Sequence, residues 1–79
     1  MTNAEIGNVI GWGSKPTGTL ARIDSITAQE VAAIQRSGIG INEITQIRNF
    51  YANELARNAN NLTAAARVQL MDKILSTLP

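Results

Sequence analysis

The chain has 79 residues, with seven basic and six acidic side chains and neither cysteine nor histidine. A chain of this length buries one hydrophobic core, so we expect a single domain. Without cysteine and histidine it can form neither a disulfide framework nor a zinc site with the usual ligands, and Ser–His–Asp and Cys–His catalysis are excluded. The carboxylates are scattered along the sequence, so we expect no metal site and no cofactor.

Charge and hydropathy restrict the partners of the chain. A net charge of +1 is far below the basic excess of domains that neutralise many phosphates, which argues against nucleic-acid binding without excluding it. No apolar stretch approaches the ~20 residues of a membrane-spanning helix, and the first residues lack the basic and apolar regions of a signal peptide. We therefore expect a chain that is cytoplasmic or that reaches its destination attached to a larger protein.

Residues 1–18 contain four of the six glycines. Glycine at this density weakens both helix and strand. We interpret the segment as a glycine-rich N-terminal arm, with a short extended piece over residues 6–12, laid across a helical domain formed by residues 19–79. Trp12, the only tryptophan, is expected to anchor the arm in the core, and a platform for stacking on a ligand ring is the alternative.

The segment after the arm predicts two short helices. Apolar residues every three positions indicate a helix over residues 19–26. Thr27 and Glu30 have the spacing of a capping box, in which each side chain bonds to the backbone of the other residue, so a second helix begins there. It ends near Gly38, because glycine tolerates the left-handed conformation at a helix C-terminus.

The C-terminal half predicts the longest helices. Asn42 is expected to cap a third helix, whose apolar residues recur at spacings of three and four as far as Leu55. It ends in segment 57–61, because asparagines favour turns. Thr63 is expected to cap a last helix that runs to Pro79. The sequence therefore predicts an all-α fold, a small bundle of three to four short helices with a glycine-rich N-terminal arm.

The third predicted helix carries the densest polar cluster. Tyr51, Glu54 and Asn58 lie on one side at helical spacing, with Arg57 one turn beyond the glutamate. In a protein without histidine, a carboxylate beside a tyrosine and an arginine can bind a polar substrate or act as a general base. The same residues also fit an ordinary surface ion pair beside a half-buried tyrosine.

Six short motifs, spread over roughly residues 11–78, resemble an uncharacterised domain family at the C-terminal ends of Rhs-type bacterial polymorphic toxins. Ala59 stands where that family commonly has a proline. The motifs are Trp12-Gly13, Ala21-Arg22, Phe50-Tyr51-Ala52-Asn53-Glu54, Arg57-Asn58-Ala59-Asn60-Asn61, Ala66-Arg67 and Leu70-Met71.

The resemblance implies a toxin, or effector, domain. Such a domain is delivered as part of a larger secreted protein to the cytoplasm of a rival cell, and a cognate immunity protein neutralises it in the producing cell. Its target, and whether it acts by catalysis or by sequestration, stay open. For an enzyme we expect a cleft beneath the arm with four catalytic residues, Glu54, Tyr51, Arg57 and Arg22. We expect the substrate-binding residues to be Trp12, Asn58, Asn61 and Arg67.

Two further classes of function stay open. One is a non-catalytic protein-interaction module, which composition favours over a DNA-binding domain. The other is a helix-turn-helix DNA-binding domain with residues 28–36 and 43–57 as its two helices. In that hypothesis the groove is contacted by Gln46, Arg48, Asn49 and Asn53.

Overall fold

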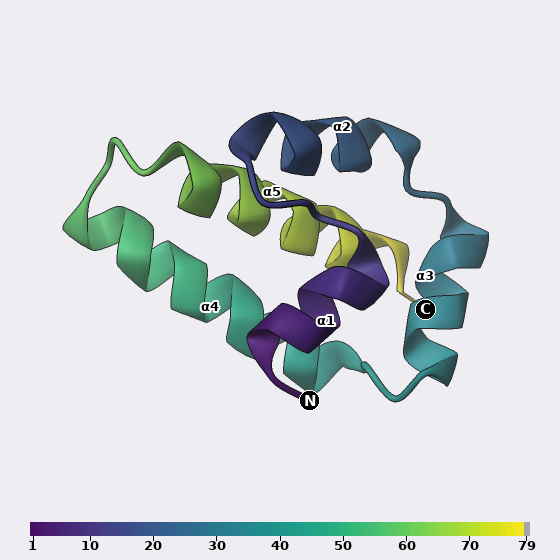
Figure 1. Ribbon diagram of the computed structural model, residues 1–79. Helices are drawn as coiled ribbons and strands as arrows, with labels where there is room; N and C mark the ends of the chain where they lie inside the picture. The colour runs from purple at the N-terminus through teal and green to yellow at the C-terminus, as the bar shows by residue number, and fades with distance from the viewer. Residues whose placement is uncertain (79) are drawn as a thin grey trace.

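The computed structural model describes residues 1–78, which are all-helical. The elements in chain order are α1 (Asn3–Ile10), α2 (Pro16–Ser25), α3 (Ala28–Arg36), α4 (Ile41–Arg57) and α5 (Leu62–Thr77). The two longest helices, α4 and α5, pack against each other, and α2 lies along α5 (Figure 1). The short α1 crosses the α4–α5 pair, and α3 lies at the end of the bundle where α4 begins (Figure 1).

The expectation of three to four helices behind a glycine-rich arm is wrong, because the described chain has five helices and α1 lies within the expected arm. The extended piece expected over residues 6–12 is wrong for the same reason. α1 begins with a capping box: the Thr2 hydroxyl accepts from the Glu5 N–H (3.2 Å), and the Glu5 carboxylate accepts from the Thr2 N–H (2.8 Å). Gly11 ends the helix in the left-handed conformation, with φ 83°.

The residues that precede α4 and α5 as N-caps differ from the two that the sequence predicts. Gly40 precedes α4 and makes no side-chain cap bond, so the cap predicted at Asn42 is wrong. Asn61, and not Thr63, caps α5 by accepting from the Ala64 N–H (3.0 Å). A capping residue needs non-helical backbone angles, and the two predicted residues already lie inside the helices.

The core is built mostly from isoleucine. It receives side chains from α1, α3, α4 and α5 and from the links between helices, and each side chain of this size stabilises the fold by about 1.5–3 kcal/mol when fully buried. The cluster consists of Ile6, Ile10, Trp12, Ile26, Val31, Ile34, Ile39, Ile44, Ile47, Leu70, Met71 and Ile74.

Trp12 fills the space between α1 and α5. Its indole is 6% exposed, lies against Gly7 of α1, and stacks under the guanidinium of Arg67 of α5 at 4.4 Å from the ring centroid. A Cβ atom at position 7 would lie 2.1 Å from the indole, so only glycine lets α1 approach this closely. Trp12 therefore anchors the N-terminal segment, as expected, but the segment that it anchors is a helix.

Arg22 joins the first three helices. Its Nε donates to the Ile10 carbonyl at the end of α1 (2.8 Å), and its Nη2 pairs with the Glu30 carboxylate at the start of α3 (2.6 Å). Glu30 also closes the capping box with Thr27, which confirms that prediction. The hydrogen bond from Arg22 is the main cause that lowers the pKa of the Glu30 carboxyl below its ordinary value.

We expect Gly7→Ala to destabilise the fold, because the new Cβ overlaps the buried indole. Overpacking of this kind costs about 1–3 kcal/mol, which lowers the Tm of a domain of this size by roughly 5–20 °C. Gly18→Ala is the matched control: it lies inside α2, its Cβ would meet only ordinary contacts at 3.7 Å and beyond, and it should stabilise by about 0.5 kcal/mol. Thermal melts that move in the same direction for both variants would contradict this role of Gly7.

We expect the stabilisation from the Arg22–Glu30 pair to depend on pH. The pKa of Glu30 is lower in the folded than in the unfolded chain, so the pair stabilises above the ordinary glutamate pKa and is lost as pH falls through the folded value. The Tm of Glu30→Gln should therefore lie below that of the wild type at neutral pH, and the gap should close as pH falls below the ordinary glutamate pKa of ~4.3. Asp24→Asn, which removes an exposed carboxylate from α2, reports the effect of net charge alone. A gap that stays constant with pH contradicts the prediction.

Candidate functional site

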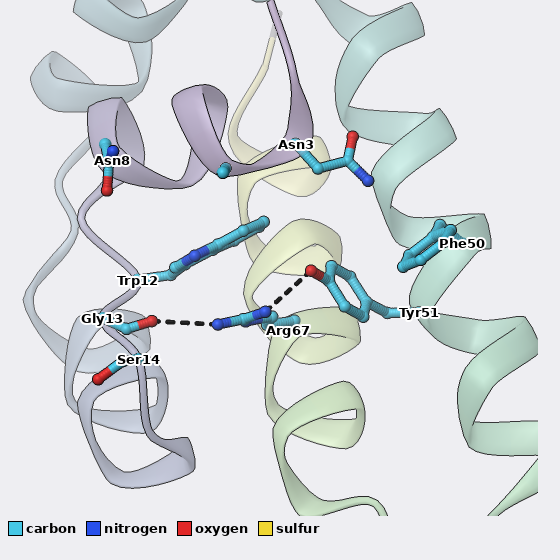
Figure 2. A pocket seen from close by; sticks show the side chains of 9 residues that line it. Asn3, Asn8, Trp12, Gly13, Ser14, Phe50, Tyr51 and Arg67 are labelled. Atoms are coloured by element: carbon cyan, nitrogen blue, oxygen red, sulfur yellow. Dashed lines mark hydrogen bonds between the residues drawn. The ribbon is translucent and has the colours of Figure 1, made fainter.

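A pocket with a volume of about 530 Å³ opens between α1, α4 and α5. α1 contributes Ala4 to one wall, together with Asn3 and Asn8 (Figure 2). The link between α1 and α2 contributes Trp12 together with Gly13 and Ser14. The pocket therefore exists because the N-terminal segment is folded over the two long helices.

Aromatic side chains from α4 form the opposite wall. Phe50 and Tyr51 are neighbours on the helix, and their rings meet edge to face with centroids 5.0 Å apart. The Tyr51 ring also meets the Trp12 ring edge to face, at 5.7 Å. Tyr51 is half-buried, whereas Phe50 is 47% exposed, so Phe50 offers a free ring at the rim of the pocket.

Arg67 of α5 lies between these rings (Figure 2). Its Nη1 donates to the Tyr51 hydroxyl (2.8 Å), and its Nη2 donates to the Gly13 carbonyl (3.1 Å). Its guanidinium stacks on Trp12, an arrangement in which a cation is attracted to the face of an aromatic ring. The Nε is buried without a hydrogen-bond partner, and an unsatisfied buried donor costs about 1–3 kcal/mol.

The pocket is positively charged. No carboxylate lines it, and Arg67 has no carboxylate partner within residues 1–78. Elsewhere in residues 1–78, three other arginines form ion pairs with carboxylates. The pairs are Arg22–Glu30, Arg48–Asp72 and Arg57–Glu54. The charge of Arg67 is therefore held by hydrogen bonds to neutral groups and by aromatic rings.

The structure brings together only part of the predicted site. Trp12, Tyr51 and Arg67 meet in the pocket. Glu54 and Arg57 form an ion pair towards the end of α4 and do not line it.

The other predicted residues have structural contacts elsewhere. Arg22 is bonded to α1 and α3, as described above. Asn58 and Asn61 lie in the α4–α5 link, where their side chains accept from the backbone N–H groups of Asn60 (3.1 Å) and Ala64 (3.0 Å). The four predicted catalytic residues are therefore not gathered around one cavity.

Sequence reasoning missed the contribution of α1. Asn3, Ala4 and Asn8 belong to the segment interpreted as a glycine-rich arm, and Phe50 is named only within a motif of the family resemblance. The signal that identifies α1 was present in the sequence, because Thr2 and Glu5 have the capping-box spacing.

Two features are absent from residues 1–78. Over this range, no group of three or more acidic side chains is close enough to hold a metal ion. None of the helices in this part of the chain has the length and apolar character needed to cross a membrane.

Comparison with known proteins places the chain in a family. A solved NMR structure of a protein from Acinetobacter baumannii is 34% identical in sequence and superimposes with a TM-score of 0.88, covering 99% of this chain and 74% of that chain. No curated protein matches the chain. The family described as a domain of unknown function, DUF4951, matches residues 1–78, and the chain therefore belongs to the DUF4951 family.

Proposed function

We propose that this domain is a C-terminal toxin domain of a secreted bacterial competition protein, which acts in the recipient cytoplasm and is neutralised by an immunity protein. The resemblance to Rhs-type toxin domains supports this context. We further propose that the domain acts by binding its target and not by catalysis. One observation carries this second part: among residues 1–78, those that line the pocket carry aromatic, amide, hydroxyl and guanidinium groups and no carboxylate.

The positions of the titratable side chains support binding over catalysis. A general base must lie within hydrogen-bond reach of the proton that it removes. Glu54, the predicted base, is paired with Arg57 outside the pocket. Tyr51 lies in the pocket, where its hydroxyl oxygen accepts a hydrogen bond from Arg67 and its own hydrogen can be donated to a ligand. The pocket therefore has groups that hold a ligand and lacks a carboxylate that would move its protons.

The dimensions of the pocket suit this function. A volume of about 530 Å³ lies within the range of small-molecule sites, which runs from about 300 to 1,000 Å³. Such a volume also accommodates one or two side chains of a protein target. The target class is therefore a small molecule or a protruding segment of a protein.

The DNA-binding alternative receives less support. The Nε of Arg48, a residue expected to contact the groove, donates to the Asp72 carboxylate of α5 (2.8 Å). This pairing reduces the positive charge on the face that would approach phosphates, in a chain whose net charge is only +1.

Growth inhibition after induction in a bacterium tests the proposal. Ala4→Trp places a large ring in the pocket and should reduce inhibition at least about tenfold, the effect of losing ~1.4 kcal/mol of binding. Ala56→Trp is the matched control, because it puts the same side chain on an exposed site of α4 outside the pocket. Glu54→Gln should keep full activity, since the proposed mechanism needs no carboxylate. Co-expression of a cognate immunity protein should restore growth in every active variant.

Three results would contradict the proposal, with circular dichroism and thermal melts used to confirm folding. A wild-type domain that leaves growth unaffected would refute the toxin function. Equal effects of Ala4→Trp and Ala56→Trp would remove the pocket from the mechanism. Loss of inhibition in a folded Glu54→Gln variant would show that a carboxylate acts in catalysis after all.

A further inference from the structure

The side chains around the pocket offer several hydrogen-bond donors, and Arg67 offers the most. A guanidinium carries five N–H groups. Within the described chain, those of Arg67 meet two acceptors, the Tyr51 hydroxyl and the Gly13 carbonyl, both of which are neutral. A guanidinium can also form two parallel hydrogen bonds to one carboxylate or phosphate, and this bidentate pairing adds energy and geometric specificity that a single neutral acceptor does not provide. Arg67 therefore keeps both the charge and the free N–H groups to bind an anion.

The other polar groups around the pocket add to this donor surface. The Tyr51 oxygen accepts from Arg67, so its own hydrogen is left to donate. The side chains of Asn3, Asn8 and Ser14 also line the pocket, and each has at least one donor hydrogen. An acidic group entering the pocket would meet several donors and no competing carboxylate.

An apolar surface lies beside these donors. The Phe50 ring is 47% exposed at the rim, and Ala4 faces the same pocket from α1. The Trp12 face that meets Arg67 is already covered, so Phe50 is the ring free to pack against a flat ligand. A cationic ligand is disfavoured, because it would lie close to the uncompensated charge of Arg67.

We propose that the pocket binds an organic anion, in which a carboxylate or phosphate group contacts Arg67 and a flat apolar body packs against Phe50. The anionic group is the shared chemistry, and its source can be a small acid or a phosphate ester. This assignment names the ligand class of the site, and its biological meaning rests on the proposed function.

An NMR titration of the isotopically labelled protein with three probes of similar shape tests the ligand class. Benzoate and phenyl phosphate carry the anion on a ring, and benzamide is the neutral counterpart. Trp12 is the only tryptophan, so its indole N–H gives an isolated signal inside the pocket. At least one anion should shift this signal saturably and bind about tenfold or more tightly than benzamide, because benzamide lacks the charge. The tighter of the two anions identifies the carboxylate or the phosphate as the preferred group.

A pair of substitutions with the same charge change tests the place of binding. Arg67→Gln is unsuitable alone, because it also removes the bonds to Tyr51 and Gly13. Asn8→Asp keeps the size of the side chain and adds a negative charge to the pocket wall, so it should weaken anion binding by about fivefold or more. Asn53→Asp adds the same charge at an exposed position of α4 outside the pocket and should leave binding nearly unchanged.

The outcomes separate this inference from the proposed function. Equal binding of benzamide and the anions, no saturable shift with either anion, or equal weakening by Asn8→Asp and Asn53→Asp would each overturn the ligand class. If these results occur while Ala4→Trp still reduces growth inhibition, the ligand class alone is wrong. If anion binding is confirmed while Ala4→Trp keeps full growth inhibition, the proposed function of the pocket is wrong and the anion site stands.

Discussion

The stacking of Gly7, Trp12 and Arg67 is the contact on which the rest of the structure depends. The indole is the layer that separates α1 from α5, and the missing side chain at Gly7 lets the helix lie directly on it. Glycine inside a helix costs roughly 0.5–1 kcal/mol relative to alanine, and burial of the tryptophan offsets this cost. Because α1 is held in this way, it forms a wall of the pocket as well as a cover for the core.

Arg67 links the stability of the fold to the chemistry of the pocket. Its bonds to Tyr51 and Gly13 hold α4 and the N-terminal link against α5, while its charge has no carboxylate partner in the described chain. Arg22, by contrast, is paired with the Glu30 carboxylate. The Nε of Arg67 is buried, so the N–H groups that remain for a ligand are the second hydrogens on Nη1 and Nη2.

The site was predictable only in part, and the residues show why. Tyr51 and Glu54 share a helical face, so their spacing suggested a common site. In the structure the Glu54 carboxylate instead pairs with Arg57, three residues further along α4. Asn58 and Asn61 follow a helix end, where their side chains serve as local hydrogen-bond acceptors for the backbone. Periodicity places residues on a face of one helix, and it contains no information on which other element covers that face.

The sequence by itself determined the local features of this protein. The capping box of Thr27 and Glu30 and the apolar periodicity of α4 depend only on residues a few positions apart, and the capping box of α1 was equally present although glycine density concealed it. Only the tertiary structure decided the pocket, because the acceptors of Arg67 lie 16 and 54 positions away along the chain. No local pattern connects residues at such separations, and their meeting follows from the packing of α1 and Trp12 over the long helices.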